Sequence, residues 1–325
     1  MATVEQTYLH SELLKRRERL QTALSVPTAD ASLAGLLKQV DSALEQMSSG
    51  TYGLCEACHE SIEPDRLLAD PLLRFCVDHL TSEERRALEG DLGLAARIQR
   101  GLLPKPEFSA AGWNARYHYE PLGVVSGDYC DLVEADGALN FLLGDVAGKG
   151  VAASMLMSHL HATFRSLMGV ALAPAQLLES ANRIFCESTM AGQYATLVYG
   201  RASASGEVEL VSAGHCPVLV VRGKKVERLD ATGVPLGMFC GSRYSSHRTR
   251  LEPNNHIVLY TDGLSEARNS AGEEYGLERI SAHVSGNHHV APASLLETCL
   301  SGVREFSAGA PRGDDMTVLV LQRAA

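Results

Sequence analysis

The sequence predicts an α+β chain in three parts: a small helical hairpin with a cysteine-rich end (residues 1–80), a linker helix (81–105) and a larger mixed domain (106–325). Three observations support this division. Two pairs of Cys or His, each separated by two residues, lie within residues 55–79, and a stretch with helical periodicity follows them. Beyond it, short segments rich in β-branched and aromatic residues are separated by Gly and Asp turns.

Composition and charge limit the classes of protein that this chain can represent. Apolar residues make up 45% and charged residues 21% of the 325 residues, which is globular composition and more chain than one core usually needs. The net charge of −10 argues against bulk binding to nucleic acid or anionic lipid. No stretch reaches the roughly 18 apolar residues of a membrane span, and no secretory core follows the N-terminus. We therefore expect a cytoplasmic protein without membrane or nucleic-acid partners.

Two apolar stripes predict the hairpin. The second stripe has the 4, 3 spacing of one helix face and consists of Leu33, Leu37, Val40, Leu44 and Met47. Leu13, Leu20 and Leu24 provide its partner. Residues 25–28 would form the turn, with Asp30 or Ser32 as the cap of the second helix.

The clustered cysteines predict a structural zinc site. Cys55 and Cys58 form one pair of ligands, and Cys76 and His79 form the other. Each pair can bring two donors to one ion, and four protein ligands leave no open position for catalysis. The other cysteines (Cys130, Cys186, Cys216, Cys240 and Cys299) are scattered and are expected to be reduced thiols.

The residues around these ligands resemble the zinc finger of the DksA/TraR family over residues 30–80. The resemblance includes Thr51–Cys55 and Arg66–Pro71. His79 stands where that family often has Cys, a change that zinc accepts. The polymerase-binding members carry acidic residues at the tip of a long hairpin, whereas this hairpin is short and offers only Asp30 there. Binding to RNA polymerase is therefore not expected, and a scaffold or dimerisation role is the preferred interpretation.

The linker is predicted to be helical over residues 81–103. Ser82 precedes an acidic first turn, and Pro104 ends the helix. A seam with heptad-like spacing runs along it and consists of Leu88, Leu92, Ala95, Gln99 and Leu102. This seam could pair two chains into a homodimer or pack on the domain that follows. In either case the helix could transmit a regulatory signal.

In the third part, strands are predicted at 115–119, 139–143, 196–201, 208–212, 218–222, 256–260 and 316–321. Helices are predicted at 151–168, 174–190 and 292–306. Because the strands do not alternate strictly with helices, we expect antiparallel sheets with helices packed outside them.

Four Asp-bearing turns lie at or near the ends of these strands: Ser126–Asp128, Gly144–Gly150, Tyr260–Gly263 and Gly313–Thr317. Asp and Gly are common in turns for conformational reasons alone. A group of carboxylates is also what magnesium or manganese prefers, and a pair of such ions activates water and clamps a phosphoryl group. The Gly144–Gly150 segment is not a P-loop, because it lacks the earlier glycine and places Gly150 where Ser or Thr would bind magnesium.

These motifs, in this order, resemble the SpoIIE/RsbU branch of the metal-dependent PPM-type serine/threonine phosphatases over residues 92–323. The segments Ala96–Pro104, Ala213–Pro217 and Thr261–Asn269 add to the resemblance. It implies a β-sandwich flanked by helices, with two Mn²⁺ or Mg²⁺ ions at one end. Asp145 would bridge the ions, the Val146 carbonyl would bind one of them, and Asp128, Asp262 and Asp314 would complete the site.

Several other polar residues are weaker candidates. Asp315 and His215 are second-tier site residues, with His215 the nearest candidate for a general acid, and Lys149 and Arg268 could help to hold phosphate. Asp131 could be an outer ligand or a turn residue. Cys130 lacks the Cys-x5-Arg loop of thiol phosphatases, and the pair His288 and His289 is expected at the surface.

The resemblance implies a protein serine/threonine phosphatase whose substrate is a phosphorylated anti-sigma-factor antagonist in a bacterial partner-switching pathway. One alternative is a transcription regulator that acts on RNA polymerase through the zinc finger and has a degenerate phosphatase domain. The four intact Asp argue against this alternative. Another keeps the enzyme and changes the substrate to a small phosphorylated molecule or an aspartyl phosphate.

Overall fold

The computed structural model describes residues 3–25, 31–80, 82–170, 172–190 and 192–325. Contacts divide the chain into two compact units, Met1–Asp91 and Leu92–Ala325. The predicted turn after Ser25 and the caps Asp30 and Ser32 fall on residues whose backbone or side chain lies outside this description. No helix within the described ranges is long and apolar enough to cross a membrane.

The first unit begins with the predicted hairpin, formed by α1 (Thr3–Leu24) and α2 (Ala31–Ser49). Leu13 and Val40 are fully buried between the two helices, and Ala43 is nearly so. Leu20, Leu44 and Met47 pack around them. The two stripes read from the sequence therefore face each other, and burial of these side chains holds the hairpin together.

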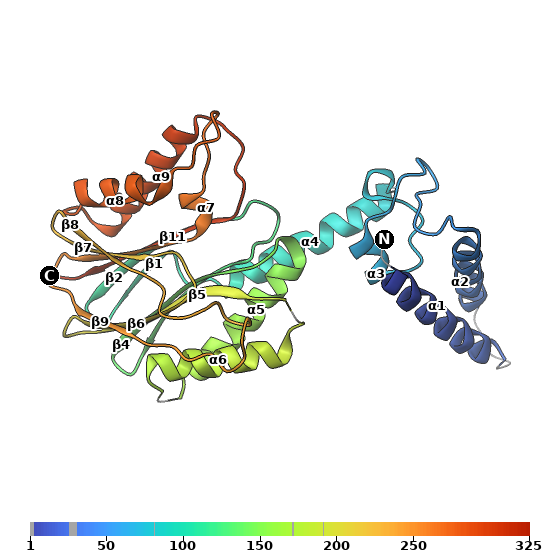
Figure 1. Cartoon of the computed structure of the whole chain (residues 1–325), viewed down its shortest axis with the longest axis horizontal. Coiled ribbons are helices and arrows are strands. Elements are labelled where there is room, and N and C mark those ends of the chain that lie inside the picture. Colours follow the sequence, from blue (N-terminus) through green and yellow to red (C-terminus); the bar gives the residue numbers. More distant parts are fainter. Residues whose placement is uncertain (1–2, 26–30, 81, 171, 191) are drawn as a thin grey trace. The chain divides into compact units, whose positions relative to one another are not determined.

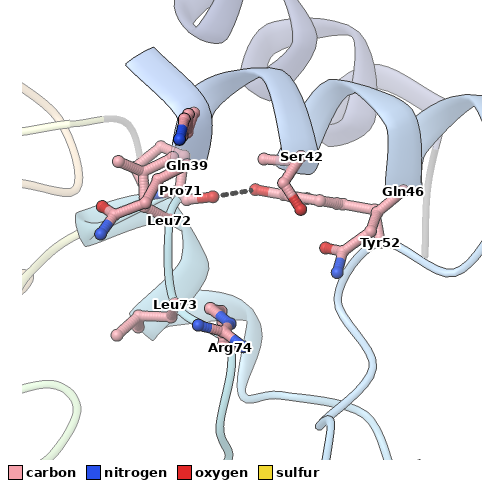
Figure 2. A pocket seen from close by; sticks show the side chains of 10 residues that line it. Gln39, Ser42, Gln46, Tyr52, Pro71, Leu72, Leu73 and Arg74 are labelled. Atoms are coloured by element: carbon pink, nitrogen blue, oxygen red, sulfur yellow. Dashed lines mark hydrogen bonds between the residues drawn. The ribbon is translucent and has the colours of Figure 1, made fainter. Parts of the chain in front are cut away.

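The cysteine-rich segment folds against α2. It contains α3 (Pro64–Ala69) and the short 3-10 helix η1 (Val77–His79). Its small core consists of Ile62 and Leu67 together with Cys55 and Cys76. The Tyr52 hydroxyl donates a hydrogen bond of 2.9 Å to the Pro71 carbonyl, beside a cavity of about 240 Å³ between α2 and residues 71–74 (Figure 2).

The predicted linker is the helix α4 (Ser82–Leu102), which begins in the first unit and ends in the second. After it, Leu103 packs against the main core of the second unit.

The second unit is a sandwich of two antiparallel sheets (Figure 1). One has the order β1-β2-β11-β10-β7-β8 and the other β3-β4-β5-β6-β9. The strands are β1 (Glu107–Ala110), β2 (Trp113–Glu120), β3 (Asp128–Ala135), β4 (Ala138–Val146), β5 (Ala195–Ser203), β6 (Glu207–Ala213), β7 (Val218–Arg222), β8 (Lys225–Leu229), β9 (His247–Arg250), β10 (His256–Tyr260) and β11 (Met316–Arg323).

Helices cover the outer face of each sheet (Figure 1). The five-stranded sheet carries α5 (Gly150–Leu167) and α6 (Pro174–Ser188), and the six-stranded sheet carries α8 (Gly276–Gly286) and α9 (Pro292–Ser307). A short helix, α7 (Asp262–Ser265), follows β10. A third apolar cluster, which includes Trp113, Phe141 and Leu319, fills the space between the sheets. The predicted helix-flanked β-sandwich is thus confirmed.

The prediction found the strands inside the two sheets and missed those at the sheet edges. All seven predicted strands are present and lie inside a sheet, whereas β1, β3, β8 and β9, which were not predicted, are the strands at the sheet edges. Edge strands are commonly short and charged, as in His247–Arg250, because charge opposes pairing with other chains. Such segments lack the apolar run that identifies a buried strand. The helices α7 and α8 were not predicted either.

Candidate metal centres

The four predicted zinc ligands lie together. One donor atom from each of Cys55, Cys58, Cys76 and His79 lies within 4.8 Å of the others. Cys58 Sγ and Cys76 Sγ are 3.8 Å apart, and Cys76 Sγ is 3.2 Å from His79 Nδ1. A tetrahedral ion with Zn–S bonds of about 2.3 Å separates two sulfurs by about 3.8 Å. The donor set therefore fits one zinc ion with no open position.

The four carboxylates come from both sheets of the second unit. Asp128 begins β3, and Asp145 is the next-to-last residue of β4. Asp262 begins α7 directly after β10, and Asp314 precedes β11 by one residue. The antiparallel register places Asp128 opposite Asp145. The sandwich thus brings two acids from each sheet to one end, although they span nearly two hundred residues of sequence.

Glycines allow the segments of this site to approach closely. A Cβ atom on Gly127 would lie 2.9 Å from the Val146 carbonyl oxygen and 3.2 Å from Asp145 Oδ1. Any side chain at position 127 would therefore clash with both oxygens, so glycine is required beside these two predicted ligands. A Cβ atom on Gly263 would lie 1.9 Å from the Asp315 carbonyl oxygen, so only glycine lets α7 begin against the start of β11.

Two buried threonines connect the sheets at Asp128. The hydroxyls of Thr261 and Thr317 both donate hydrogen bonds to Asp128 Oδ2, at 3.0 Å for Thr261. The Thr317 amide in turn donates to Thr261 Oγ1 at 2.9 Å. Thr261 directly follows β10 and Thr317 belongs to β11, two strands of the six-stranded sheet. Asp128 belongs to the other sheet. Neither threonine was a predicted site residue, although both lie inside the Asp motifs.

The carboxylates destabilise one another's charged forms. Burial, reinforced by Asp145, raises the pKa of Asp128 well above its usual range, although the threonine hydroxyls oppose this shift. Burial and the charges of Asp262, Asp314 and Asp315 raise the pKa of Asp145 to about 7. Burial and Asp314 also raise the pKa of Asp262. Crowded oxygen donors that lack sufficient positive charge are the environment that hard divalent cations stabilise.

Asp315 holds the loop before Asp128. Its Oδ1 accepts a hydrogen bond of 2.6 Å from the Leu122 amide, and its Oδ2 accepts one of 3.0 Å from the Gly127 amide. Both oxygens of this buried side chain are therefore engaged with backbone. Asp315 positions the Asp128 turn across the two sheets.

Lys149 and Arg268 border the acidic site. Lys149 Nζ lies 2.9 Å from Asp314 Oδ2 and donates a hydrogen bond of 2.6 Å to the Gly313 carbonyl. Arg268 pairs with Glu274 at 2.8 Å. Arg268, Glu266 and Asp314 line a cavity of about 170 Å³ beside Gly263. Both cations thus have partners within the chain. Either side chain would have to leave its partner to contact a phosphate.

Comparison with known proteins identifies both units. A family model described as "Stage II sporulation protein E (SpoIIE)" matches residues 135–324, more than half of the chain. The chain belongs to the SpoIIE family. A second model, described as the prokaryotic dksA/traR C4-type zinc finger, matches residues 50–78 and ends one residue before His79. The chain therefore carries a SpoIIE-type PPM phosphatase domain and a DksA/TraR-type zinc finger.

Individual relatives agree with this assignment. Protein IcfG of Synechocystis sp. is 25% identical over 72% of this chain and 41% of its own length, so the chain spans less than half of that relative. The phosphoserine phosphatase RsbU of Bacillus subtilis is 26% identical over 74% of this chain and 72% of RsbU. The SiaA-PP2C domain of Pseudomonas aeruginosa has the same fold, with a TM-score of 0.65 and 19% identity over 74% of this chain and 99% of that domain.

His215 has a structural position in the SpoIIE domain, next to the strand that pairs with Asp145. Its ring is buried, and Nδ1 lies 2.8 Å from Thr196 Oγ1, on the residue that pairs with Asp145 in the sheet. Burial lowers the pKa of His215 to about 4. The ring is therefore neutral near pH 7 and lacks the acidic proton of an imidazolium, so His215 is not favoured as a general acid.

Asp131 is not a turn residue, because it lies within β3 and is fully buried. Arg165 of α5 donates two hydrogen bonds to it, from Nε at 2.7 Å and from Nη2 at 2.6 Å. This pair attaches α5 to β3. Cys130 is also fully buried, where burial raises the pKa of its thiol well above the usual range, so it is no nucleophile. His289 is exposed, and His288 is half-buried with Nδ1 2.9 Å from the Ser285 carbonyl oxygen.

The C-terminal end of α4 packs on the SpoIIE domain through its polar seam residue. Gln99 is 4% exposed; its Nε2 donates to the Ser126 carbonyl at 2.7 Å, and its Oε1 accepts from the Ser126 amide at 3.0 Å. Ser126 Oγ then accepts a hydrogen bond of 3.0 Å from the Asp128 amide. The linker helix is therefore connected to a predicted metal ligand through one residue.

Proposed function

We propose that this protein hydrolyses phosphoserine or phosphothreonine in a protein substrate, using two Mn²⁺ or Mg²⁺ ions. The observation that carries the proposal is the gathering of Asp128, Asp145, Asp262 and Asp314 at one end of a PPM-type sandwich. When bound, a divalent metal pair supplies Lewis acidity that activates water and offsets charge on the phosphoryl oxygens.

The residues of the chain have distinct roles in this proposal. Asp145 would be shared by both ions, and the Val146 carbonyl would bind one of them beside it. Asp128, Asp262 and Asp314 would complete the coordination, with Thr261, Thr317 and Asp315 holding Asp128 in place. Helix α5 begins directly after the metal loop without a side-chain cap, so its first amides are free to attract a phosphate oxygen.

The zinc finger would be structural. Its four proposed ligands would fill a tetrahedral shell, which would leave no position for substrate. We propose that it stabilises the first unit and provides a regulatory or oligomerising input, with α4 as the connection to the SpoIIE domain. Pairing of two chains through α4 remains part of this proposal.

For the substrate we propose a phosphorylated anti-sigma-factor antagonist of a partner-switching pathway. The support is the similarity to RsbU, a phosphoserine phosphatase, over most of both chains.

Turnover of defined substrates tests the activity. The purified protein should hydrolyse p-nitrophenyl phosphate and a phosphoserine peptide only with added manganese or magnesium. Equal or greater turnover of acetyl phosphate, used as the probe for acyl phosphates, would contradict the protein substrate. Metal-independent hydrolysis would contradict the two-metal site.

Substrate capture tests the identity of the substrate. An Asp262→Asn variant should retain folding and bind phosphoproteins from lysate that wild type releases. Mass spectrometry of the captured proteins, with Asp230→Asn as the control for an exposed carboxylate, should identify an antagonist protein. Capture of RNA polymerase without phosphoprotein would favour the transcription-regulator alternative.

A further inference from the structure

Four large apolar side chains are exposed beside the acidic site. Met190, Tyr194, Met238 and Phe239, here called the apolar rim, have exposed fractions of 74%, 36%, 46% and 65%. Met190 and Tyr194 lie on the connection between α6 and β5, and Met238 and Phe239 lie on the connection between β8 and β9. Single exposed apolar residues are ordinary, whereas a group of them often marks an interaction surface.

The two connections contact each other through their backbones. A Cβ atom on Gly237 would lie only 2.6 Å from the Gln193 carbonyl oxygen. Gln193 also closes its own turn, since its amide donates to the Met190 carbonyl at 3.2 Å and its side-chain oxygen accepts from the Met190 amide at 3.0 Å. The four residues of the apolar rim therefore flank a single backbone contact.

A buried amide fixes the loop that carries Met238 and Phe239. Asn182 of α6 is fully buried; its Oδ1 accepts from the Gly237 amide at 2.9 Å, and its Nδ2 donates to the Phe239 carbonyl at 2.9 Å. The Ser242 hydroxyl also donates to the Phe239 carbonyl, at 2.8 Å. These hydrogen bonds fix the backbone of the loop that exposes Phe239. A partner that binds there therefore loses less conformational entropy of the loop on binding.

The apolar rim adjoins the metal loop. The Ala147 amide donates a hydrogen bond of 2.9 Å to the Tyr194 carbonyl, directly after Val146. Val146 pairs with Ala195, and Ala195 exchanges hydrogen bonds of 2.9 and 2.8 Å with Leu236. Two strand spacings of about 4.8 Å place Leu236 about 10 Å from Val146. Met238 and Phe239 follow two and three residues later.

We propose that the apolar rim is a specificity-determining surface that binds apolar side chains of the substrate about three to five residues from the phosphoserine. This inference rests on the proposed phosphatase function. An extended chain advances about 3.3 Å per residue, so a segment held at the metals reaches the rim over that number of residues. Methionine suits this task because its flexible side chain adapts to different apolar partners, and aromatic rings offer a large apolar area.

Matched phosphopeptides test the inference. One peptide carries leucines at positions three to five on both sides of phosphoserine, and its partner carries serines there. Wild type should hydrolyse the leucine peptide with a kcat/KM about tenfold higher, as expected for burial of one or two apolar side chains. The double variant Met238→Ser/Phe239→Ser should reduce this preference to less than about twofold.

Val170→Ser is the matched control. Val170 is 53% exposed in the same domain but lies beyond the C-terminal end of α5, whereas the metal loop precedes the other end of that helix. This variant should keep the full preference for leucine. Turnover of p-nitrophenyl phosphate, which is too short to reach the rim, serves as the reference for the metal site in each protein.

The outcomes separate this inference from the function on which it rests. Equal turnover of both peptides by wild type, or a preference that survives in the double variant, would refute the proposed role of the apolar rim. The proposed phosphatase function would be unaffected by that result. Absence of metal-dependent turnover of every phosphate ester would overturn the proposed function and the rim with it.

Discussion

The zinc site and the acidic site are built in opposite ways. The predicted zinc ligands lie within 25 residues of sequence, and their donor atoms lie within 4.8 Å of one another. The predicted acidic ligands come from β3 and β4 of one sheet, and from the start of α7 and the segment before β11, which adjoin strands of the other sheet. A local site needs only one ion and a short chain, whereas a dispersed site needs the whole sandwich to fold first.

The difference also concerns charge. In the zinc finger, the ion is expected to organise the chain, because a unit with so small a core gains much of its folding energy from metal binding. In the SpoIIE domain, packing of the large apolar cores brings the carboxylates together. Burial and mutual repulsion raise the pKa values of Asp128, Asp145 and Asp262, so their charged forms are destabilised. We therefore expect metal to organise the first site and to relieve repulsion in the second.

Removal of Asp145, the ligand that both ions would share, should have the largest effect on turnover. Asp145→Ala should lower manganese-dependent turnover of p-nitrophenyl phosphate at least about a thousandfold, because both ions lose a ligand. Zinc content, measured by elemental analysis, should stay at that of wild type. Asp230→Ala, which removes an exposed carboxylate, should retain activity. Turnover of Asp145→Ala near the wild-type rate would refute the two-metal assignment.

Loss of a zinc ligand should affect only the local site. Cys55→Ser should abolish stoichiometric zinc and unfold residues around 50–80, which hydrogen exchange would detect as loss of protection. Turnover of p-nitrophenyl phosphate should stay within about twofold, because the second unit has its own cores. Cys240→Ser, at an exposed thiol, is the control. A collapse of turnover would show that the two centres depend on each other.

A conservative change at the junction of the sheets should have an intermediate effect. Thr317→Val keeps the shape of the side chain but leaves Asp128 Oδ2 with one hydroxyl donor, from Thr261. We expect the manganese concentration for half-maximal turnover to rise about tenfold, since a hydrogen bond to a charged group contributes about 1.5–3 kcal/mol. Thr298→Val, which removes a bond only to its own helix, should behave as wild type. An unchanged metal requirement would show that the threonines do not position Asp128.

The pH dependence of metal binding should also distinguish the two sites. The pKa of Asp145 is raised to about 7, above its unfolded value near 3.8, so folding favours the protonated form. This group therefore contributes stability to the metal-free protein at low pH, which is lost as pH rises toward 7. Manganese, which needs the carboxylate, should raise Tm more at pH 8 than at pH 5.5. An equal Tm shift at both pH values would contradict the crowded-carboxylate picture.

The linker should produce the smallest effect. Leu92→Glu disturbs the seam that includes Gln99, which is hydrogen-bonded to Ser126. Turnover should therefore change about threefold without a change in mass if this seam packs on the domain. Leu94→Glu, on an exposed position of the same helix, is the control. A halved mass by light scattering would show that the seam pairs two chains, and no change in either property would make α4 a passive spacer.

The sequence by itself determined the features that depend on neighbouring residues. The zinc ligands, the hairpin stripes, the linker helix and every strand inside the two sheets could be predicted, because spacing and apolar runs are local properties. The Asp motifs could be located as well. That they would share one end of the sandwich came only from resemblance, since no local pattern encodes which turns meet.

Tertiary structure decided the rest, because those features depend on partners far along the chain. The edge strand β3 places Asp128 and Asp131 among apolar residues, where pairing with β4 and the ion pair of Asp131 with Arg165 hold them. Asp315 and Thr317 resemble ordinary turn and strand residues until the other sheet places Gly127 and Asp128 beside them. The rim is likewise invisible in sequence, because the loops that carry Met190 and Phe239 meet only when Gly237 packs on Gln193.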